Sequence, residues 1–216
     1  MKLKPLLSLA AIGAALLIGV YVILGGSGNM LGSFGGQANA SACDMAVEHS
    51  HTLADVATGE VAAFRPLDAP LDLSEIAFKD RNGNPAKLGD WKGKTVLFNL
   101  WATWCPPCRE EMPYFETLQS DLGGDTFDVV PVSIDTNGTE GPLEFYEETG
   151  LEVLPYFQDE TMEAFQGLRR QAVALGMPTT LLMDTNGCGL GVLNGAAHWA
   201  SDDAVRLIKA AIELGG

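Results

Sequence analysis

The chain carries the sequence TVLFNLWATWCPPC at residues 95–108, in which an apolar run is followed by two cysteines, Cys105 and Cys108. The run over residues 95–101 is typical of a buried strand. Pro106 and Pro107 favour a helix start, because the N–H groups of the first turn have no partner within a helix. A strand, a CxxC sequence and a helix together predict a redox centre that exchanges a dithiol with a disulfide.

A position at a helix N-terminus gives Cys105 the properties of a nucleophile. Free backbone N–H groups and the helix dipole favour negative charge there, so we expect its thiol to ionise below the value of about 8.5 for free cysteine. We expect the Cys105 thiolate to attack a substrate disulfide, and Cys108 to resolve the mixed disulfide that forms. The N–H of Cys108 remains available to stabilise the Cys105 sulfur.

A structural disulfide and half of a zinc site are the alternatives for this pair. A zinc site requires two more ligands at a suitable spacing, and the chain has no second CxxC and no CxxH. We therefore expect an enzyme, a thiol:disulfide oxidoreductase, with no cofactor and no metal.

The first residues predict a membrane anchor. Lys2 and Lys4 precede an apolar run over residues 5–24, and twenty helical residues span roughly the 30 Å of a bilayer's hydrocarbon core. The next basic residue is Arg65, so the positive-inside rule places residues 1–4 in the cytoplasm and the rest of the chain outside it.

A cleaved N-terminal signal is the alternative to an anchor. Ala38-Asn39-Ala40 satisfies the A-x-A rule, and Cys43 is where a lipoprotein signal would end. Both lie well beyond the apolar run, which is itself longer than the roughly 7–15 residues of a signal-peptide core. We therefore favour an uncleaved anchor, followed by a flexible glycine-rich tether at residues 25–42 and a single domain at residues 43–216.

The charge of the chain is concentrated in that domain. All 28 acidic residues follow Cys43, against 11 basic ones once Lys2 and Lys4 are set aside. Such an excess disfavours nucleic acid and anionic membrane surfaces as partners. It either steers the domain toward basic partners or keeps it soluble.

The two remaining cysteines, Cys43 and Cys188, are 145 residues apart. As a disulfide they would stabilise the fold by roughly 5 kcal/mol at most, because the loop that they close is long. Two free thiols, or Cys188 as a third redox residue, are the alternatives. We favour the structural bridge, which suits an oxidising compartment.

The other patterns predict a mixed sheet with helices on both faces. Apolar residues at helical spacing over 44–64 predict one or two short helices, and Asn82-Gly83 predicts a hairpin turn within 71–94. In chain order we then expect a strand at 95–101, a helix at 106–121, a strand at 127–134, a helix at 142–149, a strand at 153–157, a helix at 162–175, a hairpin of 179–183 and 190–194, and a last helix that is capped by Ser201 and ends at Gly215.

Further residues are candidates for the neighbourhood of the cysteine pair. Met177-Pro178 leads into a predicted strand, a position that allows a cis bond and would expose backbone to an extended substrate. Trp104 is expected to shield the disulfide at the surface. Glu110 or Glu111, at the start of the predicted helix, is a candidate proton acceptor for Cys108.

The sequences LWATWCPPCREEMP at residues 100–113 and LGMPT at residues 175–179 resemble the TlpA/ResA/CcmG-like branch of the thioredoxin superfamily. The TlpA-like members, membrane-anchored periplasmic thiol:disulfide interchange proteins, are the most similar. The resemblance covers residues 43–214 and implies a thioredoxin-like fold with an N-terminal extension, a central insert at residues 137–160 and a disulfide between Cys43 and Cys188. It also implies that substrate is bound by Trp104, Pro106, Pro107, Met177 and Pro178.

The same resemblance implies a monomeric reductase in the bacterial periplasm, held in the inner membrane. Its implied substrates are a Sco-like copper chaperone and the CuA subunit of cytochrome oxidase, and its implied electron donor is a membrane protein of the CcdA/DsbD type. A CcmG-like reductase of apocytochrome c and a copper-binding chaperone are the alternatives. Asn99 stands where thioredoxin has a buried carboxylate, which leaves the proton acceptor of Cys108 unassigned.

Overall fold

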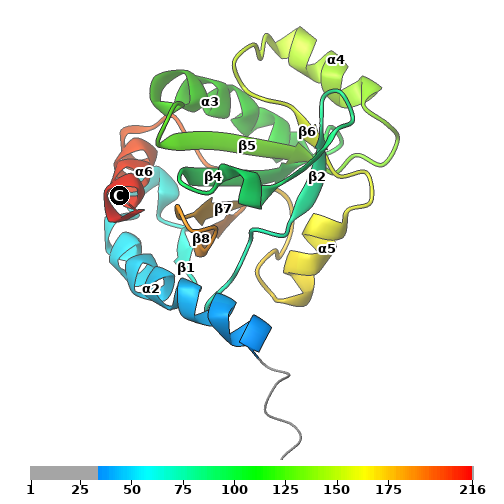
Figure 1. Ribbon diagram of the computed structural model, residues 1–216. Coiled ribbons are helices and arrows are strands. Elements are labelled where there is room, and N and C mark those ends of the chain that lie inside the picture. Colours follow the sequence, from blue (N-terminus) through cyan, green and yellow to red (C-terminus); the bar gives the residue numbers. More distant parts are fainter. Residues whose placement is uncertain (1–33, 216) are drawn as a thin grey trace, which may run out of the picture. The chain divides into compact units, whose positions relative to one another are not determined.

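The computed structural model describes residues 34–215 of the chain (Figure 1). The predicted cytoplasmic residues 1–4, the predicted anchor at 5–24 and the first part of the predicted tether lie outside the described residues. Among the helices of the described part, none is both long enough and apolar enough to cross a membrane.

Strand β4 (Thr95–Trp101) lies in the interior of the sheet, and all seven of its residues are buried. It pairs in parallel with β5 (Phe127–Ser133) and antiparallel with β7 (Thr179–Met183). A strand with a partner on each edge and helices over both faces has no solvent side, which explains its nearly continuous apolar sequence. The predicted strand at 95–101 is confirmed.

Within residues 34–215 the strands form one eight-stranded mixed sheet in the order β1-β8-β7-β4-β5-β6-β2-β3. The outer strands are β1 (Arg65–Pro66), β2 (Ala77–Asp80), β3 (Pro85–Lys87), β6 (Phe157–Gln158) and β8 (Gly189–Asn194). The hairpin of β2 and β3 turns at Asn82-Gly83, and that of β7 and β8 turns at residues 184–188, as the sequence predicts.

Helices cover both faces of this sheet, as predicted. They are α2 (Phe34–Val56), α3 (Pro106–Leu122), α4 (Glu140–Thr149), α5 (Glu163–Arg170) and α6 (Asp202–Gly215), with short 3₁₀ helices η1 (Gly59–Val61) and η2 (Leu88–Trp91). In the view of Figure 1, α3 and α4 lie above the sheet and α2 and α5 lie below it. The Oγ of Ser201 accepts from the N–H of Ala204 at 3.2 Å, so the predicted cap of α6 is confirmed.

Two boundaries differ from the predictions at the ends of helices. Residues 34–42 belong to α2 and not to a flexible tether, because alanines at positions 38, 40 and 42 favour a helix. Helix α5 ends at Arg170 and does not reach residue 175. Ala172 has a φ of 56°, which is incompatible with a right-handed helix.

The predicted strand at 153–157 is largely a loop. The carboxylate of Glu116 on α3 accepts hydrogen bonds from the backbone N–H groups of Glu152, Val153 and Leu154, at 2.8–2.9 Å. These N–H groups are therefore not available to a neighbouring strand, and β6 is limited to Phe157–Gln158. The side chain of Glu116 ties the central insert to α3.

The structure pairs Cys43 with Cys188, the bridge that the sequence favours. Their Cα atoms are 5.4 Å apart, and both residues are buried. The bond joins α2 to the turn between β7 and β8, so it fastens the N-terminal extension to the sheet.

Replacing both Cys43 and Cys188 with alanine is expected to lower the free energy of unfolding by roughly 2–5 kcal/mol, because the unfolded chain loses a long closed loop. Denaturant unfolding of the oxidised protein measures this loss. Replacing Cys105 and Cys108 together is the control, since that pair closes a ring of only a few residues. Equal losses in the two double variants would contradict the assignment of the first bridge as the stabilising one.

Candidate active site

Cys105 is the N-cap residue of α3, directly before Pro106. It forms a disulfide with Cys108, with Cα atoms 5.3 Å apart, and its Sγ accepts the backbone N–H of Cys108 at 3.3 Å. The exposed fraction is 5% for Cys105 and 0% for Cys108. An incoming disulfide can therefore reach Cys105 first, which fits the predicted division into nucleophile and resolving residue.

The segment between β4 and α3 is held by a carboxylate that the sequence did not single out. Asp135 accepts the backbone N–H of Thr103 at 3.0 Å and its hydroxyl at 2.6 Å. The hydroxyl of Ser133, the last residue of β5, donates to the same carboxylate at 2.8 Å. Because β4 and β5 are parallel, their carboxyl ends meet at one edge of the sheet, and a polar residue just after β5 is the signal that points to this contact.

The loop before β7 lies at the same edge. Leu100 pairs with Thr179, which places Met177 and Pro178 beside the end of β4, near the segment that leads to Cys105. The Met177–Pro178 peptide bond is cis. Pro178 is buried and Met177 is half-buried.

Asn194 at the end of β8 holds this loop in place. Its Oδ1 accepts from the N–H of Leu175 at 2.8 Å and from the hydroxyl of Thr179 at 3.0 Å, and its Nδ2 donates to the carbonyl of Val173 at 3.1 Å. The conformation of the proline loop is thus set by a side chain from the adjacent strand.

Large apolar side chains are exposed on both of these segments. Trp104, next to Cys105, is 60% exposed, and Leu175, in the proline loop, is 66% exposed. Pro106 and Pro107 are exposed as well. Exposed apolar groups of this size are suited to contact with another protein, and the predicted role of Trp104, Pro106, Pro107, Met177 and Pro178 in substrate binding remains a prediction.

Glu111 is a buried carboxyl group one helical turn after Cys108. Its Oε1 accepts from Nδ2 of Asn99 at 2.9 Å, and its Oε2 accepts from Nε1 of Trp199 at 3.1 Å and from the N–H of Ala197 at 3.3 Å. Burial raises the pKa of this carboxyl to about 8, although the three donors lower the pKa in part.

The structure therefore separates the two candidate proton acceptors. Glu110 is exposed, whereas Glu111 lies in the buried stripe of α3 with Cys108, Met112, Phe115 and Leu118. From the sequence, Asn99 replaces the buried carboxylate of thioredoxin, but the interior of this protein still contains a carboxylate beside Asn99. Asn99 binds a carboxylate that α3 supplies, and the helical spacing of Glu111 from Cys108 is the signal that identifies it.

The central insert contacts the start of α3 as well as its middle. The guanidinium of Arg109 lies over the ring of Phe145 on α4, 5.1 Å from its centroid. Trp101, at the end of β4, packs against Phe145 and Tyr146 at centroid distances of 5.4 and 5.9 Å. Helix α4 is thereby joined to both sides of the cysteine segment.

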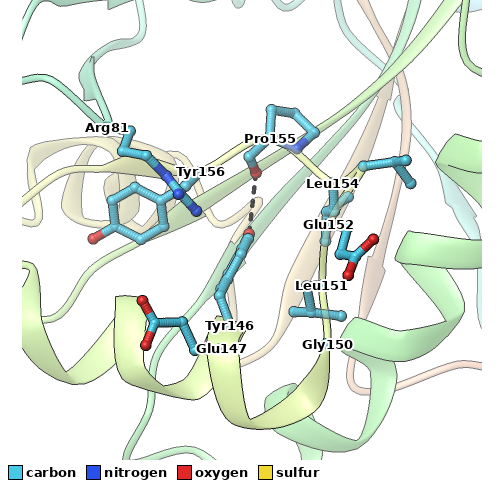
Figure 2. A pocket seen from close by; sticks show the side chains of 10 residues that line it. Arg81, Tyr146, Glu147, Gly150, Leu151, Glu152, Leu154, Pro155 and Tyr156 are labelled. Atoms are coloured by element: carbon cyan, nitrogen blue, oxygen red, sulfur yellow. Dashed lines mark hydrogen bonds between the residues drawn. The ribbon is translucent and has the colours of Figure 1, made fainter.

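The insert also carries a surface depression that is separate from the cysteine site. Figure 2 shows Arg81 and Tyr156 at one end of it and Glu152 and Leu154 at the other, with the hydroxyl of Tyr146 donating to the carbonyl of Pro155 at 3.0 Å. Its lining residues do not include either cysteine. Within residues 34–215, no three His, Cys, Asp or Glu side chains are grouped so that they would hold a metal ion.

Comparison with known proteins agrees with this geometry. The model of the family "Redoxin" matches residues 66–200. The chain is 33% identical over 114 residues to thioredoxin-like protein YneN of Bacillus subtilis, which covers 52% of this chain and 64% of the relative. It is 36% identical over 137 residues to thiol-disulfide oxidoreductase ResA of Oceanobacillus iheyensis, which covers 62% of this chain and 67% of the relative. The chain thus spans about two thirds of the length of these curated relatives.

Two solved structures from Chlorobium tepidum have a similar fold. A thiol:disulfide interchange protein of the thioredoxin family is 27% identical, with a TM-score of 0.54, and the match covers 66% of this chain and 97% of that one. A candidate thiol:disulfide interchange protein DsbE is 28% identical, with a TM-score of 0.56, and the match covers 65% and 95%. These likenesses agree with the predicted thioredoxin-like fold.

The raised pKa of Glu111 predicts a pH-dependent stability. The folded protein binds this proton up to about pH 8, whereas the unfolded chain releases it near pH 4.3. The stability that Glu111 contributes is therefore complete below the unfolded pKa and is lost as the pH rises through about 8. Glu111→Gln is expected to remove a decline of a few kcal/mol between pH 5 and pH 9, since one pKa unit corresponds to about 1.4 kcal/mol.

Denaturant unfolding of the oxidised protein at both pH values measures this decline. Glu110→Gln, which changes an exposed neighbour on the same helix, is the matched control and is expected to keep it. If Glu111→Gln and the unchanged protein lose stability in parallel, Glu111 does not hold a proton in the folded state.

Proposed function

The chain belongs to the Redoxin family, and we propose that it is a thiol–disulfide oxidoreductase that reduces disulfides in other proteins. The observation that supports this most directly is the position of Cys105. Its sulfur lies at the N-terminus of α3 and accepts the N–H of Cys108, and Cys105 is the more accessible residue of the pair.

The reaction starts from the reduced pair and follows the usual course of disulfide exchange. The Cys105 thiolate attacks one sulfur of the substrate disulfide, the substrate S–S bond breaks, and its electron pair leaves on the other substrate sulfur as a thiolate. Cys108 then loses its proton and attacks the Cys105 sulfur, the S–S bond between Cys105 and the substrate breaks, and the substrate sulfur leaves as a second thiolate. The products are a substrate with two thiols and the Cys105–Cys108 disulfide that the structure contains.

Glu111 is the group that we assign to the proton of Cys108. Cys108 is fully buried, so water has poor access to its thiol, and Glu111 lies one turn further along the same face of α3. A carboxyl with a pKa of about 8 exchanges protons in the pH range in which thiols do.

We further propose that the protein acts in the bacterial periplasm, anchored in the inner membrane by residues 5–24. The run of apolar residues behind Lys2 and Lys4 supports the anchor. The buried Cys43–Cys188 disulfide supports an oxidising compartment. A donor of the CcdA/DsbD type would return electrons to the Cys105–Cys108 pair.

The proposed substrates are the cysteine pairs of a Sco-like copper chaperone and of the CuA subunit of cytochrome oxidase. The resemblance to TlpA-like proteins supports this choice. It rests in part on the Cys43–Cys188 disulfide and on the Met177-Pro178-Thr179 loop of this chain. The likeness to a DsbE candidate supports the second candidate, a CcmG-like reductase of apocytochrome c.

Trapping of mixed disulfides in cells distinguishes these two candidate functions. Cys108→Ala leaves the Cys105 thiolate without a resolving thiol, so the variant is expected to accumulate mixed disulfides with its substrates in cells. Cys105→Ser is the control, expected to trap nothing and to lose essentially all reductase activity. Mass spectrometry of the trapped proteins identifies the partner.

Sco-like protein or CuA subunit in the trapped fraction supports the first candidate, and apocytochrome c supports the second. An empty trap with an intact Cys105 would remove the support for both.

A further inference from the structure

Trp199, in the connection between β8 and α6, binds the one buried carboxyl group that lies next to the cysteine pair on α3. Its indole is fully buried and is stacked on Phe115 of α3, with ring centroids 5.7 Å apart and planes 21° apart. The ring orientation is thus fixed by packing, and its N–H points at Oε2 of Glu111.

The two oxygens of Glu111 have different surroundings. Oε2 accepts from the indole N–H of Trp199 and from the backbone N–H of Ala197. Neither group can accept a hydrogen bond, so a proton on Oε2 would face two donors. Oε1 faces only the amide of Asn99 among the hydrogen bonds that the described residues make.

The amide of Asn99 can serve both protonation states of Oε1. Its Nδ2 donates to ionised Glu111 and also lies 2.9 Å from the hydroxyl oxygen of Thr180, while its buried Oδ1 has no hydrogen-bond partner among the described residues. Rotating the amide exchanges the two ends. Oδ1 then accepts the proton of Oε1 and the hydroxyl proton of Thr180, and no donor is left facing a donor.

We propose that Trp199 is a positioning residue for the reaction, which keeps Oε2 of Glu111 engaged as an acceptor and leaves Oε1 as the atom that takes and returns the proton. The proposal rests on the proposed function through the role of Glu111. It adds the residue that decides which oxygen is available and how readily that oxygen is protonated.

Few other groups around Glu111 are titratable. His198, between the two residues that donate to Oε2, contacts Tyr114 of α3 with ring centroids 4.0 Å apart. Strands β4 and β7 contribute neutral groups. The groups that hydrogen-bond to Glu111 are Asn99 on β4 and Ala197 and Trp199 before α6. Thr180 on β7 hydrogen-bonds to Asn99, and Cys108 lies one turn before Glu111 on α3.

Trp199→Phe tests the proposal, because it keeps an aromatic ring against Phe115 and removes the donor, and Trp101→Phe controls for the smaller ring. Losing a hydrogen bond to a charged group is expected to move the protonation midpoint of Glu111 upward by about one pH unit or more. Infrared spectroscopy of the oxidised full chain measures the midpoint from the carboxyl C=O band that Glu111→Gln abolishes. The pH profile of insulin disulfide reduction by the reduced protein is expected to shift in the same direction.

Trp101→Phe is the matched control. Trp101 is also fully buried, but its indole N–H has no hydrogen-bond partner among the described residues, so the midpoint is expected to stay where it is. If Trp199→Phe does not fold, nuclear magnetic resonance of the unchanged protein replaces it. The indole N–H signal of Trp199 must then titrate with the Glu111 midpoint, and that of Trp101 must not.

An unchanged midpoint in Trp199→Phe, an equal shift in Trp101→Phe, or a shifted midpoint with an unshifted rate profile would each overturn the proposal. If the wild-type protein reduces no protein disulfide, the proposed function is refuted instead. The infrared titration requires no substrate, so it would still decide whether Trp199 holds Glu111.

Discussion

The contact between the sulfur of Cys105 and the N-terminus of α3 is the constraint on which the site depends. A thiolate is favoured there because the helix dipole is positive at this end and the backbone N–H of Cys108, which has no helical partner, points toward the sulfur. The rest of the fold keeps the sulfur in this place. Strand β4 carries the chain to the edge of the sheet, Asp135 fixes Thr103 on the way to Cys105, and Pro106 begins the helix without losing a hydrogen bond.

A second constraint is the burial of Glu111, which lowers the stability of the fold once the carboxyl ionises. A carboxyl group in an apolar interior is costly when ionised, and the raised pKa of Glu111 expresses that cost. Three donors offset part of it. The chain retains a group that weakens the fold at alkaline pH, and such retention is expected where proton exchange is needed beside a buried thiol. Stability and reactivity are thus balanced at one side chain.

Much of the fold follows from local patterns in the sequence. The strand at 95–101, the helix after the CxxC pair, the two hairpins and the cap at Ser201 each rest on periodicity or turn residues that tertiary contacts do not override. The segment at 153–157 shows the limit. Its residues favour a strand, but the carboxylate of Glu116 binds the N–H groups at its start, and no local pattern reveals a partner about 36 residues away.

The candidate site shows the same division. Both cysteines and the proline loop were predictable because each belongs to a short sequence motif, CxxC for the cysteines and Met-Pro before a strand for the loop. Glu111 was predictable only as one of two adjacent candidates, since burial decides between them and depends on how α3 rotates against β4. Asp135, Asn194 and Trp199 come from other parts of the chain, and their contacts exist only once the sheet has formed.

The most direct test of the account is the pH dependence of Cys105 alkylation in the reduced protein. Rates with iodoacetamide, measured from pH 4 to pH 10 in a variant without Cys43, Cys188 and Cys108, report the ionisation of this one sulfur. Activation by the helix N-terminus predicts a midpoint well below the value of about 8.5 for a free thiol. A midpoint at or above that value would show that the helix N-terminus does not activate Cys105.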